Sequence, residues 1–411
     1  MIFDDFIAGS LVVMNCTTLA KNNNVKVQLD PESKNGHFHV TISSNDPIIY
    51  NRDTCTIKLE SGGLSSQFSL YVSINNQSIF ELTGTVSKIS HKGKCYSVDQ
   101  FIYVIPNSAD KYFVHNQVSW VSSLGCTFKI NSDLVAVYFP EQLSSNDDKF
   151  DVYSLHIDER IRFLTTILTF CRSTTVEWES KYSFLKERKV AFDYIKSRSE
   201  ESFPNQINPL RRDSVSWESF ILHCMENEIS MDDLVANGVF QAIGNLRWNQ
   251  TIDEWSLIRL VAALEGLVSS NETIIPESQW KKIRRSFVCR VKEAKSDYGL
   301  CDGSVDDIVK NLNNSDRIIN QYSIKKRVES CFKQLGLGSY YNLKSVSINN
   351  AINSRNSIVH TGWDKDIDEP LWDMIVTLRN SIYLLVMRKL NYNGDFWFCN
   401  SDEKQTLAKY V

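Results

Sequence analysis

The sequence has no apolar run that approaches 18 residues, about the length that a helix needs to cross a bilayer. We therefore expect no transmembrane helix. Acidic Asp4 and Asp5 stand close to Met1, where a secretory signal peptide needs a basic flank. The ten cysteines are never closer than 12 residues apart, so neither a CxxC pair nor a zinc-ribbon spacing occurs. Together these absences predict a cytoplasmic protein with reduced thiols and no membrane partner.

Sequence motifs of several large enzyme classes are also missing. No P-loop, GxGxxG, GxSxG or HExxH motif is present, which argues against a nucleotide hydrolase, a dehydrogenase and a serine hydrolase. His37 and His39 share one face of a predicted strand, but no acidic or cysteine partner is evident beside them. We therefore expect neither a metal site nor a cofactor.

Charge is unevenly distributed along the 411 residues. The net charge is -4, yet residues 275–360 hold 15 Lys and Arg against 8 Asp and Glu. Any attraction to a polyanion is therefore expected in this part of the C-terminal half. A hydrophobic content of 42% and a charged content of 23% are typical of a globular protein, and the length favours two or three domains.

The first 155 residues alternate polar and apolar side chains in short runs, such as residues 25–29, 37–42, 68–72 and 134–138. This period-two pattern, with frequent turn residues, predicts an antiparallel β domain that is sandwich-like or barrel-like. A helix over residues 158–170 and a strand over 175–178 are expected to follow. We place the β-rich domain at residues 1–200 and a linker at 201–213, where Pro204 and Pro209 oppose helix formation.

Residues 214–411 have the periodicity of helices, so the predicted fold class is α+β and multidomain, with a β-rich front and an all-helical back. Thr251 and Glu254 have the spacing of a capping box that starts a helix. Further helices are expected over residues 277–295, 316–334, 345–360 and 369–390. Gly336 and Gly338 are expected to stop the helix that ends at residue 334.

The helix predicted over residues 345–360 carries an arginine within its apolar stripe. Ile348, Ile352 and Ile358 mark the stripe, and Arg355 takes the position between the last two. A charge on that side needs a partner, because an unpaired buried charge is costly. Two interpretations stay open: a structural arginine that pairs with an acid or caps a helix, and a functional one.

Asn356 and His360 lie four residues apart and share a face of the same helix, next to Arg355. An imidazole transfers protons near neutral pH, and a guanidinium holds a phosphate and neutralises the charge that develops on it. Groups of these kinds cleave RNA without a metal. A lone histidine at the end of a helix is often a cap for the helix dipole, so this alternative also stays open.

The segment Arg355-Asn-Ser-Ile-Val-His360 resembles the R-x4-6-H signature of the HEPN ribonucleases, which are small helical domains of toxins, antiphage abortive-infection proteins and RNA-guided CRISPR ribonucleases. Residues 254–267 resemble the first HEPN helix of the ApeA-like branch. Residues 162–178 are similar to the end of the β-rich N-terminal domain in ApeA-type defence proteins. The resemblance implies an HEPN-type helical domain at 214–411 that acts as a homodimer, with two copies of the motif in one cleft.

This resemblance implies that Arg355 and His360 form the catalytic pair and that Asn356 assists them. Glu265 falls where some HEPN domains carry an acidic residue, and the alternative is a solvated or salt-bridged glutamate. The implied activity is a metal-independent endoribonuclease in antiphage defence, restrained until a phage-derived trigger acts through the β-rich sensor domain. The alternative is a non-catalytic HEPN-type interaction module whose β-rich domain binds a ligand or a protein.

A run of basic residues in the helix predicted over 277–295 is the candidate RNA-binding site. Its members are Lys281, Lys282, Arg284 and Arg285. Such side chains follow a phosphate backbone without reading its sequence. An ordinary solvated helix face is the alternative.

Overall fold

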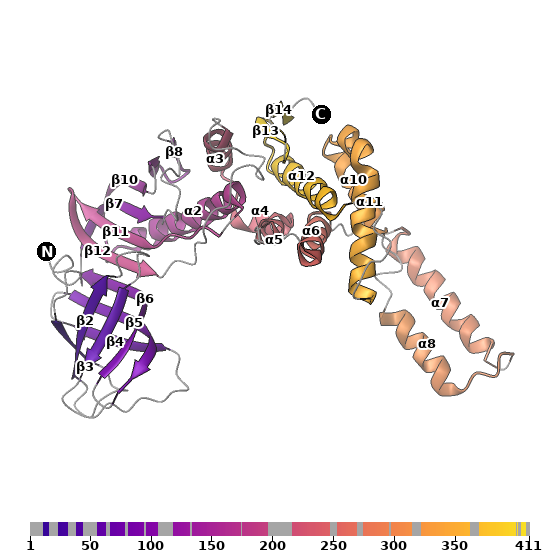
Figure 1. Ribbon diagram of the computed structural model, residues 1–411, viewed down its shortest axis with the longest axis horizontal. Helices are drawn as coiled ribbons and strands as arrows, with labels where there is room; N and C mark the ends of the chain where they lie inside the picture. The colour runs from indigo at the N-terminus through magenta and orange to yellow at the C-terminus, as the bar shows by residue number, and fades with distance from the viewer. Residues whose placement is uncertain are drawn as a thin grey trace. The chain divides into compact units, whose positions relative to one another are not determined.

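The structure, a computed structural model, describes residues 11–15, 24–31, 38–43, 56–62, 66–78, 81–93, 96–105, 118–131, 134–173, 175–195, 216–246, 253–268, 274–295, 297–314, 322–361, 370–399, 401 and 404–407. The chain divides into two compact units, Met1–Asp233 and Leu234–Val411. β-sheet is concentrated in the first and helices in the second, so the fold is α+β, as predicted (Figure 1). No helix among these residues is both long and apolar enough to span a bilayer.

The N-terminal unit is built on one antiparallel sheet, whose described part has 12 strands. They are β1 (Leu11–Asn15), β2 (Asn24–Pro31), β3 (Phe38–Ser43), β4 (Thr56–Gly62), β5 (Ser66–Gln77), β6 (Glu81–Gly93), β7 (Ser97–Val104), β8 (Val118–Val121), β9 (Thr127–Asn131), β10 (Leu134–Ser144), β11 (Ser180–Leu185) and β12 (Arg188–Ile195). Their order is β3-β2-β1-β4-β5-β6-β12-β11-β7-β10-β9-β8. The four predicted runs of alternating residues lie in β2, β3, β5 and β10, which confirms those strands.

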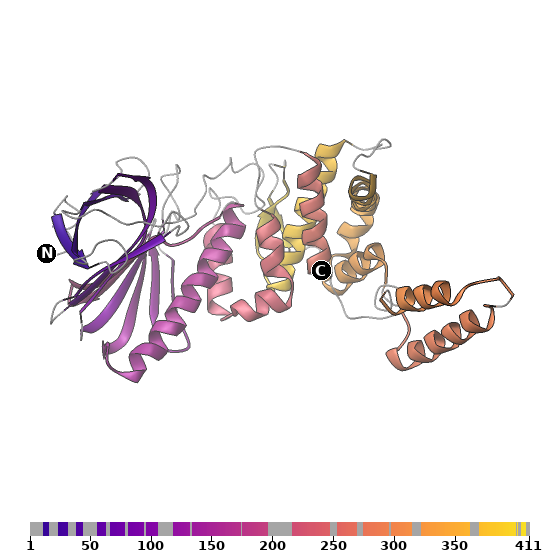
Figure 2. The same cartoon turned by 90° about the horizontal axis from the view of Figure 1, so that it is seen from below.

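The first six strands close into a barrel, because β3 pairs with β6 as well as with β2 (Figure 2). Apolar side chains that are at most 1% exposed form its core: Val27, Val40, Ile42, Val72 and Leu82. Gly84 of β6 is required there, since a Cβ would lie 2.3 Å from the carbonyl oxygen of Ser73. The β-rich domain is thus a barrel continuous with an open sheet, and the prediction of a sandwich gives way to its barrel-like alternative.

Helix α2 (Asp148–Arg172) contains the helix that was predicted over residues 158–170 and packs against β10. Asp147 caps its start by accepting a hydrogen bond from the backbone N–H of Lys149, and Ser173 ends it in the left-handed region with a φ of 59°. The strand predicted over 175–178 is wrong, since pairing begins only at Ser180. Trp178 instead packs edge-on against Tyr103, with ring centroids 5.7 Å apart.

Helix α3 (Ser216–Glu226) belongs to the N-terminal unit and packs against α2 and β8. Arg160 of α2 donates hydrogen bonds to the carbonyl oxygens of Met225 (3.1 Å) and Ile229 (2.8 Å), which satisfies acceptors at the end of α3. The division between the units falls within α4 (Met231–Ala236), beyond the helix that the prediction assigned to the second domain. The predicted linker, residues 201–213, lies outside the described residues.

Among its described residues, the C-terminal unit is helical apart from one short hairpin. Its elements are α5 (Val239–Asn245), α6 (Glu254–Leu267), α7 (Glu277–Glu293), α8 (Asp302–Asn314), α10 (Ile324–Gln334), α11 (Gly338–Thr361), α12 (Leu371–Lys389), β13 (Asp395–Trp397) and β14 (Lys404–Thr406). Helix α12 is buried along almost its whole length and packs against α5, α6 and α11. The expected helix over 369–390 is thus confirmed, and it forms the centre of this unit.

Three helix starts in the C-terminal unit differ from the predictions. α10 begins at Ile324, after the N-cap Ser323, and not at residue 316. α6 is capped by Asp253, whose carboxylate accepts hydrogen bonds from the N–H and the hydroxyl of Ser256, both at 2.9 Å, and not by the predicted capping box at Thr251. α11 begins at Gly338 and not at residue 345, because Gly336, with a φ of 76°, already ends α10. The extra turns bury Tyr340 and Tyr341.

Candidate active site

Arg355 lies on the face of α11 that packs into the C-terminal unit. The apolar neighbours on that face, Ile348, Ile352 and Ile358, are at most 9% exposed. The Arg355 side chain is 26% exposed, so its stem is covered while part of the guanidinium reaches solvent. The stripe in the sequence therefore predicted correctly that this arginine points inward.

The guanidinium of Arg355 is held by two partners. Nη2 forms an ion pair with Oε2 of Glu265 on α6 at 3.0 Å, and Nη1 donates to Oδ1 of Asn356, also at 3.0 Å. The third nitrogen, Nε, is buried and has no hydrogen-bond partner in the described part of the chain. The charge is thus compensated by an acid, as the structural interpretation of Arg355 requires, while the arginine keeps donor capacity. Glu265 is the salt-bridged glutamate of the alternative interpretation.

His360 lies in the last turn of α11, and its side chain is exposed. In an α-helix each residue turns the direction of the side chain by about 100°, so five residues place His360 about 140° around the helix from Arg355. Asn356 is only about 40° from His360 by the same geometry. A single chain therefore brings Arg355 to Asn356 and Glu265 but presents His360 on the outward side of the helix.

The outward side of α11 also carries two large apolar side chains. Leu343 is 76% exposed and Val346 is 72% exposed. They recur with Asn353 and His360 at spacings of three, seven and seven residues, which places all four on one side of the helix. Large aliphatic side chains are uncommon on the solvent-exposed side of a helix. Their presence in line with an imidazole is typical of a face that another protein surface covers.

The predicted RNA-binding residues all lie on α7, which has no buried residue. Lys281, Lys282 and Arg285 are exposed, and Arg284 is half-buried. Lys281 also forms an ion pair with Glu277 at 3.4 Å, one turn earlier. The helix is therefore a basic surface that is open to a polyanion, and its geometry alone fits the solvated-face alternative as well.

Metal-binding groups are sparse in the described part of the chain. No cluster there of three or more His, Cys, Asp or Glu side chains has the arrangement to hold a metal ion. Of the two histidines weighed as ligands, His39 lies on β3, whereas His37 lies outside the described residues.

Sequence reasoning missed two features of this region. It left the acid that pairs with Arg355 unassigned, because α6 and α11 are far apart in the chain and only their packing makes Glu265 the partner. It also missed the outward side of α11, although Leu343 and Val346 already stood at heptad-like spacing from His360 in the sequence.

Comparison with known protein families, with curated proteins and with solved structures finds no match to this chain. The chemistry of the site therefore has to be argued from its own groups. These are a paired and partly exposed guanidinium, an amide that contacts it, and an exposed imidazole one and a half turns further along the same helix.

Proposed function

We propose that this protein is a metal-independent endoribonuclease of the HEPN class that acts in antiphage, abortive-infection defence. The observation that carries the proposal is the arrangement of side chains on α11. Arg355 is anchored by Glu265 and Asn356. His360 is exposed on the side of the helix that also exposes Leu343 and Val346, which a second protein surface could cover. An anchored cation and a free imidazole suit the two tasks of RNA cleavage, charge stabilisation and proton transfer.

Arg355 and His360 have separate roles in the proposed reaction. His360 takes the proton from the 2′-hydroxyl of the substrate, which then attacks the adjacent phosphorus. Arg355 neutralises the negative charge that develops on the phosphate oxygens, and Asn356 holds the guanidinium in place. The imidazolium formed on His360 returns its proton to the departing 5′-oxygen as the P–O5′ bond breaks, so the products carry a 2′,3′-cyclic phosphate and a 5′-hydroxyl.

A second copy of the chain completes the proposed site. Leu343 and Val346 would be covered by pairing of two outward sides of α11, which is an isologous contact. Since His360 lies on that side, the pairing brings two imidazoles to one cleft. In this arrangement the partly exposed guanidinium groups of the two Arg355 side chains contact the substrate phosphate at the edge of the cleft.

Helix α7 binds the RNA backbone in this proposal. Lys281, Lys282, Arg284 and Arg285 contribute four positive charges on one helix, and neutralised phosphates release counterions. Replacing all four by glutamine is expected to weaken binding alike for unrelated RNAs and to flatten its salt dependence. An unchanged salt slope would support the solvated-face alternative.

The β-rich domain is proposed to restrain the nuclease until a phage-derived trigger binds. A nuclease that cuts host RNA must be silent in uninfected cells, and a large domain without candidate catalytic groups suits a regulatory task. The proposed setting is cytoplasmic, where host RNA is available.

A second function has support from one observation. The ion pair between Arg355 and Glu265 stabilises the contact of α11 with α6 without any catalysis, and a covered α11 face needs no chemistry either. On this view the C-terminal unit is an HEPN-type interaction module, and the β-rich domain binds a ligand or a protein.

The two functions are separated by expressing the intact chain and the variants Arg355→Ala, His360→Ala and Asn353→Ala. Asn353 is the matched control, because it is exposed on the same side of α11. With a phage lysate supplied as trigger, we expect growth arrest and RNA cleavage with the intact chain and with Asn353→Ala, and loss of both with the other two variants at unchanged melting temperature. Equal RNA integrity for all four soluble proteins, with a phage lysate supplied as trigger, would favour the interaction module.

A further inference from the structure

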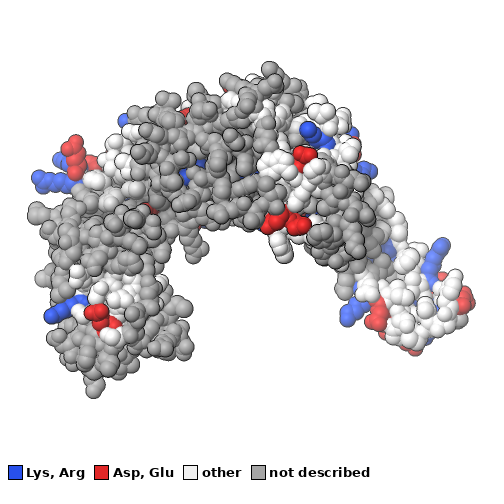
Figure 3. Space-filling view, in the orientation of Figure 1, with Lys and Arg blue, Asp and Glu red and all other residues white. Residues whose placement is uncertain are grey.

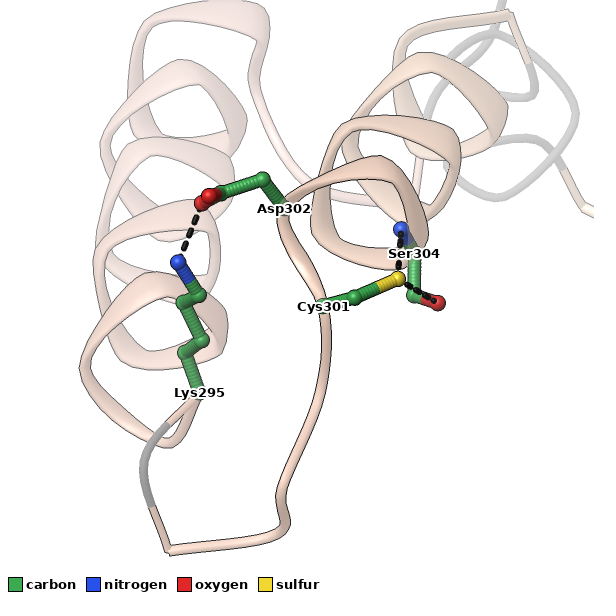
Figure 4. Close-up of polar contacts among 4 residues, drawn as sticks. All are labelled: Lys295, Cys301, Asp302 and Ser304. Carbon is green, nitrogen blue, oxygen red and sulfur yellow. Dashed lines mark hydrogen bonds and ion pairs between the residues drawn. The ribbon is translucent and has the colours of Figure 1, made fainter.

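Helices α7 and α8 lie side by side and form an antiparallel pair, which we call the helical arm (Figures 1 and 2). At the tip of the arm, Lys295 forms an ion pair with Asp302 across the connection between the helices (Figure 4). Tyr298 and Leu300 donate backbone hydrogen bonds to the carbonyl oxygens of Ala294 and Lys295. These contacts fix the turn, so the two helices are presented as one element.

The arm leaves most of its apolar surface uncovered. On α7, Trp280, Ile283, Phe287 and Val291 recur every three or four residues and form one stripe. Phe287 is 51% exposed and Ile283 is 47% exposed, and no residue of the helix is buried. A helix of 17 residues ordinarily draws most of its stability from burying such a stripe. The α7 stripe therefore needs a cover that α8 does not supply.

Helix α8 shows the same deficit. Its apolar residues Val305, Ile308 and Val309 also share a side, but only Val305 is buried, and Ile308 is 38% exposed. Two paired helices cannot bury two such stripes completely, whereas four helices do so in a bundle. A second pair of helices would bury the apolar surface that both helices of the arm expose.

The charges of α7 and α8 favour a second copy of the arm as this other pair of helices. α7 carries six basic and two acidic side chains, while α8 carries three acidic and one basic. In the space-filling view the arm occupies the lower right, where basic and acidic side chains border uncharged surface (Figure 3). Placing α7 of one chain on α8 of another joins opposite charges, whereas placing α7 on α7 joins like charges. A two-fold axis makes this favourable contact twice.

We infer that the helical arm pairs with the arm of a second copy of this chain, α7 against α8 in both directions, to form a four-helix bundle. Phe287, Ile283 and Ile308 lie in its core. Arg290 flanks the α7 stripe and Asp306 borders the α8 stripe, so these two charges face each other where α7 packs on α8 of the partner arm. The contact is separate from the α11 face and does not depend on the proposed nuclease activity.

The test measures the mass of the full chain by sedimentation over a range of micromolar concentrations. All proteins carry Leu343→Asp, which removes the apolar contact expected through α11 and so separates this test from that of the proposed function. We expect this background to self-associate and Phe287→Asp to shift the midpoint about tenfold or more. Ile283→Asp is expected to act alike, and Leu155→Asp, on an exposed side of α2 in the other unit, is expected to change nothing.

Charge reversal gives the sharper experiment. One variant reverses the charge beside the α7 stripe (Arg290→Glu), and the other reverses the charge beside the α8 stripe (Asp306→Lys). Each variant alone opposes like charges and is expected to be monomeric, whereas an equimolar mixture restores opposite charges and is expected to form heterodimers. High salt is expected to weaken association of the unreversed chain.

Three results would overturn this inference. The first is a monomer at every concentration, and the second is a mass that Phe287→Asp leaves unchanged. The third is a monomer whose Phe287→Asp variant loses binding to a 30-mer RNA or to anionic vesicles, because the stripe would then serve a nucleic acid or a membrane surface. Circular dichroism confirms that each variant stays helical.

Discussion

Arg355 of α11 and Glu265 of α6 are 90 residues apart in the chain, yet their side chains form an ion pair at 3.0 Å. Both side chains are mostly buried, with exposed fractions of 26% for Arg355 and 32% for Glu265. The ion pair joins α11 to α6 within the C-terminal unit. If Arg355 contacts a substrate, it does so while it remains paired with Glu265.

Removing the acid of this pair is expected to destabilise the C-terminal unit. Glu265→Gln leaves the half-buried guanidinium without its counter-charge, and we expect a loss of about 1 kcal/mol in the free energy of unfolding, since solvent screens part of the interaction. Glu329→Gln is the matched control, because Glu329 pairs with Lys333 at 2.6 Å on an exposed helix side. Urea unfolding of the two variants measures the loss in the free energy of unfolding. Equal losses would mean that the Arg355–Glu265 pair stabilises the fold no more than an exposed ion pair does.

A second buried cation anchors α2 in the N-terminal unit. Lys181 is 8% exposed, and its Nζ lies 2.8 Å from Oδ1 of Asp158 and 4.2 Å from the centre of the Phe101 ring. The hydroxyl of Tyr103 donates to the same carboxylate oxygen at 2.6 Å. Burial first, and then the charge of Asp158, raise the pKa of Tyr103 well above its ordinary value, so the phenol stays a neutral donor.

Asp158→Ala therefore leaves both a buried cation and a buried hydroxyl without their acceptor. We expect a loss of about 2 to 3 kcal/mol in the free energy of unfolding. Lys181→Met keeps the apolar stem over the Phe101 ring and is expected to cost less. Glu159→Ala, at the exposed neighbouring position of α2, is the control. A smaller loss for Asp158→Ala than for Lys181→Met would contradict this account.

The sequence predicted local structure well where one pattern dominates. Alternation in residues 25–29 and 134–138 was enough to identify β2 and β10, because each strand buries one face. The closure of the barrel was not predictable, since it depends on β3 pairing with β6 across intervening strands. Trp178 misled the prediction of a strand, because an aromatic residue that packs against Tyr103 has the same local pattern as one in a sheet.

The candidate site divides in the same way. The position of Arg355 within the apolar stripe of α11 predicted that its side chain faces inward and needs a partner of opposite charge. The helical repeat alone was enough for this prediction. Which acid pairs with it follows from the packing of α6 on α11, and that is tertiary information. Placing His360 on another side of the helix than Arg355 needed only the helical repeat, and it shows why one chain does not assemble the pair by itself.

Cys301 is expected to be the more reactive of two exposed thiols in the arm. Its Sγ lies 3.1 Å from the Ser304 hydroxyl oxygen and accepts a hydrogen bond from the Ser304 backbone N–H at 3.4 Å (Figure 4). The hydroxyl, and then the backbone N–H, lower the pKa of Cys301 below its ordinary value. More thiolate is therefore present near neutral pH than for an ordinary cysteine.

Alkylation with iodoacetamide, followed by peptide mass spectrometry, measures this difference. Near neutral pH we expect Cys301 to react a few-fold faster than Cys289, the exposed thiol of α7. Ser304→Ala is expected to slow Cys301 and to leave Cys289 unchanged. Equal rates in the parent protein would rule out a stabilised thiolate.

The last prediction concerns the chemistry of RNA cleavage. We expect the proposed reaction to proceed in EDTA, because its proton transfer and its charge stabilisation are assigned to His360 and Arg355, and none of its steps uses a metal ion. Asp364, Asp366 and Asp368, which follow the motif in the sequence, lie outside the described residues. Without a metal-bound hydroxide, the substrate's own 2′-oxygen is the nucleophile within reach of His360.

This route makes a demand on the substrate that a metal-dependent nuclease does not make. DNA and 2′-O-methylated RNA lack the attacking hydroxyl, so both are expected to resist cleavage at concentrations where they still bind α7 and compete with RNA. End-group analysis of an EDTA-treated digest is expected to find 2′,3′-cyclic phosphates and 5′-hydroxyls, and His360→Ala is expected to lower the rate by about 100-fold or more. Cleavage of an all-DNA strand, or 5′-phosphate ends that disappear with the chelator, would show that Arg355 and His360 serve a different reaction from the one that their positions on α11 suggest.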